Sequence, residues 1–594
     1  MTIPQRICFV TRIPLYLPHP QIRNKFSRRG NPERSKVFVS DHEVTLPVSE
    51  ASPAIAGATS GTSASGWQPL SNPLFRAIWL ASVASNIGTW MHNVGADWLM
   101  TSLAPSPWMV ALMQTAENGP LFLLALPAGA LADIVDRRRL LLYTQGWMLL
   151  SAVSLAVLTL LGLTTPWVLL ILIFCLGLGS ALNAPAWQAI IPELVPRSEL
   201  PAAVSLNSVA FNIARAVGPA LGGLVVAAAG SWAVFLLNSL SFVGVIIVLY
   251  RWRREDVESI SPTERIVGAM RAGLRYVRHD PALQSVLVRT GVYVSCASAL
   301  WAMMPLVARS QLGLSAGGYG VLLGSLGAGA ILAAFILPAL RRRFNVNTLV
   351  IAGTIVFAGT TATLATVRNF PFLCLAMLCG GIAWMTLMSS FNVIVQTIVP
   401  SWVRARVLAT YMLIFFGGMA LGSAIWGIIA THLGVSETLL FAAGALIAGL
   451  AAAYFFPLQA GGELDLEPSL HWPDPVYVTE PHPQDGPVLV TVEYQIDPSR
   501  ADDFAAAMRD VKRVQQRNGA VRWGLFVDPA QPTQYVETFL VESWAEHMRQ
   551  HARVTMEDRV VQDRAGSFHV GPNAPLVTHL IAQDISKTNT KDDG

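Results

Sequence analysis

The chain has 594 residues, of which 53% are hydrophobic and only 13% are charged, and its formal net charge is +4. A soluble domain carries about 25% charged residues, so this composition excludes an ordinary soluble protein and indicates a chain that lives in lipid. The near-neutral charge gives no reason to expect a nucleic-acid partner. Five cysteines show neither a disulfide framework nor a metal-binding spacing.

The first 66 residues are basic at the start and then consist of small residues, SPAIAGATSGTSASG. No apolar stretch of 7 to 15 residues precedes a small-residue cleavage site, so a signal peptide is not expected. We predict a disordered basic extension, 1–66. The alternative is an upstream start that the cell does not use.

Long apolar runs fill the chain from residue 70 to residue 457. A helix needs about 17 to 25 apolar residues to cross a membrane, and twelve runs meet this requirement. They are centred in 76–102, 107–131, 140–163, 167–191, 203–228, 232–250, 284–308, 316–338, 347–367, 370–397, 405–431 and 437–457. We therefore predict an all-α polytopic membrane protein with twelve transmembrane helices: an N-terminal half (70–250), a central loop (251–283) and a C-terminal half (284–457).

Arginines mark one side of the predicted membrane domain. The loops after runs 2, 4, 6, 8 and 10 contain RRRL, PRSE, RWRRE, RRRF and VRAR, whereas the other short loops contribute only Arg309 and Arg368. Because short cytoplasmic loops carry the excess of Lys and Arg, we expect these loops, the central loop and both termini in the cytoplasm of a cell with this protein in its inner (plasma) membrane. Arg137, Arg138 and Arg139 are then topology anchors.

The two halves are related by a weak internal repeat. An ungapped shift of 204 residues places the three arginines at 137–139 on those at 341–343, and Gly218 on Gly422. Two six-helix repeats are typical of transporters that move two halves about a central site, and a membrane scaffold without transport is the alternative. The shift sets Asp136 opposite Leu340.

Ionisable side chains inside a membrane span usually mark an ion or substrate path. Run 1 carries Asn86, Asn93 and Asp97 on one helical face, run 2 carries Glu117 and run 5 carries Arg215. We predict that Asp97 and Glu117 couple transport to protons, with Arg215, Asn93 and Asn86 beside a small-molecule substrate. The alternatives are a solvated Asp97 at the end of run 1, and a structural Glu117–Arg215 pair.

The C-terminal half has almost no buried acids. It offers aromatic residues and methionines, which suit a bulky apolar ligand or are simply core: Trp384, Tyr411, Phe415, Phe416, Met385, Met388, Met412 and Met419.

After run 12 the composition changes to a proline-rich linker (458–487) and a soluble domain (488–594) with a short disordered tail. Strand and helix patterns occur in the order βαββαβ, with strands at 489–496, 521–527, 535–541 and 575–582. Ser543 and Glu546 predict a capping box for one long second helix. This order predicts a small α+β, ferredoxin-like domain. His547 and His551 share a helix face, a spacing that either binds metal or lies in solvent; without a third ligand, no metal or cofactor is expected.

The stretch GALADIVDRRR (129–139) resembles the loop 2–3 signature of the major facilitator superfamily. Gly129, Asp133 and the three arginines match; Ile134 and Asp136 depart from the commonest form. The resemblance covers 70–457 and implies a conformational latch. In this latch, Asp133 lies against the N-terminus of the eleventh predicted span (405–431) while the outer gate is open. A helix N-terminus carries roughly half a positive charge, which suits this role.

A second stretch, ARAVGPALGG (214–223), is similar to the glycine-proline motif of antiporters and exporters in that superfamily. Gly218, Pro219, Gly222 and Gly223 form the predicted packing surface, and plain close packing is the alternative reading. With 193–212, this stretch resembles the branch that contains the enterobactin exporter and transmembrane secretion effectors. The C-terminal domain resembles the dimeric α+β barrels of the antibiotic-biosynthesis monooxygenase type, which implies a homodimer.

The sequence therefore predicts a proton-coupled exporter of a siderophore, secondary metabolite or drug, embedded in membrane lipid and without enzyme activity. An uncoupled uniporter or importer is the first alternative. A membrane-anchored sensor or enzyme that acts through the C-terminal domain is the second.

Overall fold

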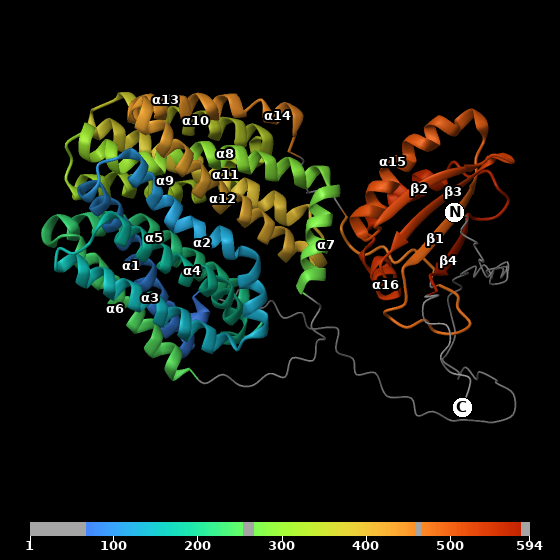
Figure 1. The fold of residues 1–594 in the computed structure, drawn as a ribbon, viewed down its shortest axis with the longest axis horizontal. Coiled ribbons are helices and arrows are strands. Elements are labelled where there is room, and N and C mark those ends of the chain that lie inside the picture. Colours follow the sequence, from blue (N-terminus) through green and yellow to red (C-terminus); the bar gives the residue numbers. More distant parts are fainter. Residues whose placement is uncertain (1–66, 253–265, 459–464, 474, 584–594) are drawn as a thin grey trace, which may run out of the picture. The chain divides into compact units, whose positions relative to one another are not determined.

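The computed structural model describes residues 67–252, 266–458, 465–473 and 475–583. The predicted N-terminal extension, most of the first part of the central loop and the end of the tail lie outside these residues. Two bodies of secondary structure are present: a helical bundle formed by α1 to α14 and a four-stranded sheet with three helices (Figure 1).

Six helices form the N-terminal half. They are α1 (Pro73–Leu103), α2 (Pro107–Ile134), α3 (Arg137–Leu160), α4 (Pro166–Leu194), α5 (Leu200–Ala229) and α6 (Ser231–Arg251). The C-terminal half follows a short helix, α7 (Ile266–His279), which lies where the sequence predicted only a loop. Its helices are α8 (Pro281–Leu306), α9 (Ala316–Arg343), α10 (Val346–Thr366), α11 (Phe370–Thr397), α12 (Ser401–Leu433), α13 (Val435–Gly449) and the single turn α14 (Ala452–Phe455).

Local sequence signals explain where these helices begin. Proline occupies the first turn of α1, α2, α4 and α8, where its missing N–H costs nothing. Side chains cap several starts; for example, Asn72 Oδ1 accepts a hydrogen bond from the Leu74 amide at 2.9 Å. Asp136 caps α3 and Asn345 caps α10 in the same way, each accepting from a backbone amide at 2.8 Å. The two caps are 209 positions apart.

Ten helical segments are long and apolar enough to cross a membrane: α3 to α6, α8 to α12, and a last one, Val435–Phe455, that joins α13 and α14. The helices α1 and α2, with 31 and 28 residues, are also long but are not among these ten. These are the two helices that contain Asp97 and Glu117. The structure thus shows a multi-pass membrane protein with ten such spans among the described residues, and the predicted count of twelve rests on α1 and α2.

The C-terminal sheet contains β1 (Val488–Gln495), β2 (Arg522–Asp528), β3 (Gln531–Val541) and β4 (Leu576–Ile581). Its strand order is β2-β3-β1-β4, and every neighbouring pair is antiparallel. The helix α15 (Ala501–Asn518) connects β1 to β2, and two helices lie between β3 and β4. Side chains from β1 and α15, including Tyr494, Phe504 and Met508, form one core.

The predicted single long helix after Ser543 is wrong. Two helices replace it, α16 (Trp544–Arg553) and α17 (Met556–Gly566). Thr555 and Asp558 form a reciprocal capping box that starts the second one, because each side chain satisfies a backbone amide of the other residue. Ser543 does cap α16, since its Oγ accepts from the Glu546 amide at 3.3 Å.

Candidate functional site

The two halves of the bundle meet along two seams, α2 against α12 and α5 against α9. On the first seam, Thr115 Oγ1 donates to the Ala420 carbonyl at 2.8 Å. On the second, a Cβ added to Gly223 would lie 2.6 Å from the Ala316 carbonyl oxygen. These contacts lie towards the end of the bundle where α1 finishes and α2 begins. We call it the α1/α2 end, and it is closed in this structure.

Asp97 lies at this closed end and bridges the two halves. Its Oδ2 accepts a hydrogen bond of 2.9 Å from the hydroxyl of Tyr319, near the start of α9. The two residues are 6% and 1% exposed, so Asp97 is not a solvated cap, which was one reading of the sequence. A buried carboxyl therefore holds α1 to a helix of the opposite half.

Glu117 approaches the same place from α2. Its Oε1 is buried and has no hydrogen-bond partner within the described part of the chain. The carboxyl lies close enough to Asp97 for the two groups to repel each other when both are ionised. Two acids from neighbouring helices thus share one buried region, and one of them has an oxygen that can accept a further donor.

Arg215 on α5 does not pair with Glu117. Of the ion pairs between described residues, none joins the two, so the structural pair that the sequence allowed is not formed. The guanidinium carbon lies 5.9 Å from the centre of the Trp90 ring, and Nε is buried without a partner in the described residues. Arg215 is therefore a cation near the interior with unused donor capacity.

The two asparagines of α1 are half-buried. Asn86 Nδ2 donates to Ser82 Oγ at 3.3 Å, a contact within its own helix. Within the described residues, Asn93 makes no hydrogen bond, and neither asparagine bonds to Asp97 or Tyr319, so their predicted place beside a substrate stays a prediction.

Two arginines of the 129–139 stretch bind other helices of the N-terminal half. Arg137 Nη1 pairs with Glu193 Oε1 at 2.7 Å on α4, and Arg138 donates to the Leu249 and Tyr250 carbonyls at the end of α6 at 3.0 and 2.7 Å. Arg139 is exposed, and a Cβ at Gly129 would meet nothing within 4 Å. The side chain of Asp133 lies outside the described residues. These arginines fasten the start of α3 to its own half.

The glycine-proline stretch of α5 divides its contacts between two helices. A Cβ at Gly218 would lie 2.5 Å from Trp90 Cβ, and one at Gly222 would lie 2.8 Å from Met91 Cα, both on α1. Gly223 instead faces α9, and a Cβ at Gly320 of that helix would lie 2.5 Å from the Pro219 carbonyl oxygen. The motif therefore provides close packing on two sides: within its half and across the seam.

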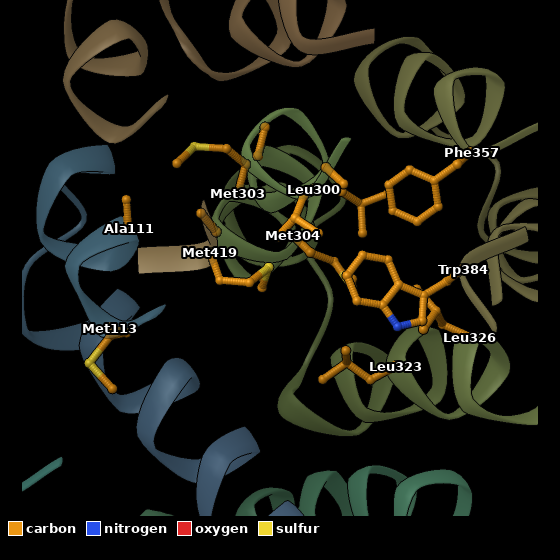
Figure 2. Close-up of a cluster of buried hydrophobic side chains, with 14 of the residues drawn as sticks. Ala111, Met113, Leu300, Met303, Met304, Leu323, Leu326, Phe357, Trp384 and Met419 are labelled. Atoms are coloured by element: carbon orange, nitrogen blue, oxygen red, sulfur yellow. The ribbon is translucent and has the colours of Figure 1, made fainter. Parts of the chain in front are cut away.

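Part of the aromatic and methionine set of the C-terminal half lies in a buried cluster (Figure 2), whereas other members are half-buried (Met385, Met388, Phe415 and Phe416) or exposed (Met412). Trp384 is 4% exposed, and its ring lies 5.5 Å from Trp301 and 5.7 Å from Phe357. In Figure 2, Met304 points to Trp384, while Met303 and Met419 lie farther from it and Met113 comes from α2. Tyr411 and Met419 are also buried. Their burial agrees with the core reading of these residues in this closed-end conformation.

Histidines of the C-terminal domain contact one another. His547 and His551 place their Nε2 atoms 3.3 Å apart, and the His579 ring lies 4.8 Å from that of His547. Burial lowers the pKa of His547 to about 3 and that of His579 to about 4. Within the described residues, no group of three His, Cys, Asp or Glu side chains is arranged to hold a metal ion.

Two residues of the closed end were missed by sequence reasoning, Tyr319 and Arg309. Arg309 Nη1 donates to Thr101 Oγ1 at 3.1 Å and also to Ser102 Oγ, and its guanidinium lies 5.3 Å from the Trp98 ring. The available signal was weak: Tyr319 is the only aromatic residue in the glycine-rich stretch AGGYGVLLGSLG, and Arg309 is one of two cations in otherwise uncharged loops.

Two helical halves that meet along paired seams and bury ionisable groups between them define a multi-pass membrane transporter. The chain matches the major facilitator family of transmembrane secretion effectors over residues 64–588. It belongs to this family. The match extends through the C-terminal sheet.

Curated relatives match about 59 to 66% of the chain at low identity. The staphyloferrin A transporter of Staphylococcus aureus (strain NCTC 8325 / PS 47) is 24% identical over 362 residues, which are 59% of this chain and 88% of the relative. The enterobactin exporter EntS of Salmonella choleraesuis (strain SC-B67) is 25% identical, over 60% of this chain and 85% of its own length. The multidrug efflux pump Tap of Mycolicibacterium fortuitum is 24% identical, over 66% and 96%.

Solved structures support the same fold. A POT family transporter in complex with 5-aminolevulinic acid superposes with a TM-score of 0.54 at 11% identity, covering 64% of this chain and 96% of that structure. A bacterial homolog of the human lysosomal transporter Spinster gives a TM-score of 0.51 at 13% identity, over 65% and 95%. At these identities the likeness concerns the fold alone.

Proposed function

We propose that this transporter is a proton-coupled exporter that works by alternating access. The observation that carries the proposal is the buried Asp97–Tyr319 hydrogen bond between the two halves, and the second acid is Glu117 on α2, whose Oε1 is buried without a hydrogen-bond partner in the described residues. The protonation of a carboxyl that holds the two halves together at one end changes the strength of that contact, and so changes which end of the carrier is open. Acids inside a membrane span usually mark an ion or substrate path. Asp97 and Glu117 are the coupling acids, and Arg215 lies near the substrate path.

The proposed substrate class is supported by the names of the relatives and by the apolar side chains of the C-terminal half. Curated relatives carry staphyloferrin A, enterobactin or several drugs, as their names state. The cluster around Trp384 and the methionines near α2 offer adaptable apolar surface when the halves separate. A siderophore, secondary metabolite or drug with apolar and polar parts fits both. Asn86 and Asn93 are polar groups on the α1 face of this path.

We assign the α1/α2 end to the outside and the opposite end to the cytoplasm of a bacterial inner membrane. The opposite end carries Arg137 to Arg139 at the start of α3, Arg251 at the end of α6 and Arg341 to Arg343 at the end of α9. Short loops with such arginine clusters stay in the cytoplasm. On this assignment, α1 and α2 also cross the membrane, which gives twelve spans with both termini cytoplasmic.

The latch proposal concerns the open-outside state, which this structure does not represent. Asp133, near the end of α2, reaches the N-terminus of α12 in that state, and Gly129, one turn earlier, leaves room for the approach because a Cβ there would meet nothing within 4 Å. Arg137 and Arg138 contribute by holding the start of α3 to α4 and α6. Asp133→Asn is then expected to shift the carrier away from the open-outside state.

The C-terminal domain is proposed to be a ferredoxin-like module that pairs with a second copy. The order β2-β3-β1-β4 with helices between β1 and β2 and between β3 and β4 supports this assignment. Alternate residues of its strands, such as Leu489, Leu540 and Leu580, share one face of the sheet. A homodimer through this face is tested by the mass of the purified protein, with and without Leu540→Glu.

The transport proposal is tested in inside-out vesicles energised to an acid interior. A panel of siderophores and lipophilic drugs is added while the pH gradient is followed for wild type, Asp97→Asn and Glu117→Gln. Substrate-triggered collapse of the gradient that either variant loses supports coupling through that acid. Downhill movement of substrate without collapse contradicts coupling and favours a uniporter or importer. Vesicles with Asn118→Ala provide a control, since the hydrogen bonds of Asn118 to described residues all lie within α2.

A further inference from the structure

A small cluster closes the α1/α2 end between α1 and the start of the C-terminal half. Tyr319 donates to Asp97, and the Trp98 ring stacks on the Tyr319 ring with centroids 6.1 Å apart and planes at 23°. Arg309 also lies over the Trp98 ring, and it reaches Thr101 and Ser102 at the end of α1. All of these contacts join residues of opposite halves, so they break when the halves separate at this end.

The remaining contacts of the seams are of a different kind. Along α5 and α9 the facing groups are glycines and backbone atoms, as at Gly223 and Gly320. Neither this packing nor the Thr115–Ala420 hydrogen bond between α2 and α12 contains an ionisable group. Among these contacts, the Tyr319–Asp97 hydrogen bond is the one whose acceptor is an acid that can gain or lose a proton.

We propose that the Tyr319–Asp97 hydrogen bond is a lock that prevents the empty carrier from opening outward. This inference rests on the proposed proton coupling and assigns the gate residue that the coupling acts on. An ionised carboxylate accepts a hydrogen bond about twice as strong as a neutral one. The lock is thus strongest when Asp97 is deprotonated and no substrate is bound.

Such a lock meets a requirement of exchange transport. A carrier that returns outward empty and deprotonated carries protons inward in each cycle without exporting substrate. With the lock in place, outward opening needs either a proton on Asp97 or a substrate group that replaces the phenol. The substrate is then expected to present a hydroxyl, amide or ammonium donor to Asp97, with Glu117 Oε1 available to accept a second donor.

Tyr319→Phe tests the lock, because it removes the hydroxyl and keeps the ring that stacks on Trp98. Tyr293→Phe is the matched control: Tyr293 is also buried, on α8, and its hydroxyl has no hydrogen-bond partner in the described part of the chain. Ser423→Cys, in a chain without its native cysteines, reports opening. Ser423 is fully buried on the face of α12 that carries Ala420 and Gly427 against α2.

Two readouts are compared without substrate. Labelling of Cys at 423 by a membrane-impermeant maleimide in right-side-out vesicles is expected to be on the order of tenfold faster in Tyr319→Phe, as for the loss of a hydrogen bond to a charged acceptor. The pH gradient of inside-out vesicles is expected to decay several-fold faster. Tyr293→Phe is expected to match the parent chain in both.

Each outcome decides a separate point. Unchanged labelling in Tyr319→Phe overturns the lock, whatever the transport assay gives. If labelling is faster but the pH gradient decays at the parent rate, the hydrogen bond closes the α1/α2 end. It then does not prevent the empty carrier from returning outward, and that part of the proposal is overturned. If the parent chain shows no substrate-triggered collapse of the gradient, the proposed proton coupling fails on its own assay, and the labelling result stands apart from it.

Discussion

Neighbouring glycines of α5 allow a sharp test of how the closed end is held. Gly223→Ala places a Cβ 2.6 Å from the Ala316 carbonyl oxygen and 3.0 Å from Gly320 Cα, across the seam to α9. Both atoms belong to the backbone, so no side chain can rotate away. Overpacking of this kind costs about 1 to 3 kcal/mol, and here the cost falls only on the state in which α5 and α9 touch at this end.

A cost of this size changes populations strongly, since each 1.4 kcal/mol is a factor of about ten. We expect the ratio of closed to open carriers at the α1/α2 end to fall by about 5- to 150-fold. The assay is maleimide labelling of Ser423→Cys from outside, as for the lock. Thermal unfolding of the same samples in detergent reports whether the fold itself has been weakened.

Gly222→Ala is the matched comparison. Its Cβ would lie 2.8 Å from Met91 Cα on α1, within the same half, so it strains the N-terminal half in every state. We expect a lower melting temperature with little change in labelling. Gly146→Ala, which would meet nothing within 4 Å, should change neither. If Gly222→Ala and Gly223→Ala accelerate labelling equally, the division of the motif between its two sides is incorrect.

Three further predictions concern the other seam and the C-terminal domain. Thr115→Val removes the hydrogen bond to the Ala420 carbonyl, and such a bond contributes about 0.5 to 1.5 kcal/mol. The rate of labelling of Ser423→Cys should therefore rise about 2- to 10-fold. An unchanged rate would show that the contact between α2 and α12 does not depend on this hydrogen bond. Burial raises the pKa of Glu537, which accepts from Trp523 Nε1 at 2.8 Å and from the Tyr494 hydroxyl at 3.2 Å. Its contribution to stability is therefore present at low pH and is lost as pH rises through its folded pKa. The opening free energy of β1 and β3, from hydrogen exchange in the full chain corrected for the intrinsic exchange rate at each pH, should fall accordingly. Glu537→Gln should remove this dependence, and Glu537→Leu should cost about 2 to 6 kcal/mol because two donors lose their acceptor. The lowered pKa values of His547 and His579, about 3 and about 4, act with the opposite sign: stability is lost as pH falls below about 6.5, by about 1.4 kcal/mol per pH unit and histidine. An opening free energy that stays constant between pH 6.5 and pH 5 would contradict their burial.

The apolar runs predicted the long helices well because the thickness of the membrane sets the same minimum apolar length for every span. Helix starts could be read from Pro and from Asn or Asp, as at Asn72 and Asp136. The ungapped repeat was less reliable. It set Leu340 opposite Asp136, whereas the structure places the equivalent cap at Asn345. In the second half the arginines 341–343 therefore end α9 and do not begin the next helix.

The candidate site could be predicted only in part. Charge inside a span singled out Asp97, Glu117 and Arg215, but their partners depend on how two halves pack, which no local pattern encodes. Tyr319 is 222 positions from Asp97, and in sequence it resembles an interfacial aromatic residue. The helix α7 was not predicted for another reason. It has too few apolar residues to span a membrane, and a search for long apolar runs does not detect a short amphipathic helix.

The glycine seam between α5 and α9 also bears on how fast the halves can move. In ordinary helix packing, side-chain ridges interlock with grooves, and one helix cannot turn against another until those ridges have climbed out. Where Gly223 and Gly320 meet, the surfaces are nearly smooth backbone. Such surfaces can move past one another with little steric resistance, so this seam adds only a low barrier to switching. The rate of switching then depends on the few side-chain hydrogen bonds at the edge of the seam.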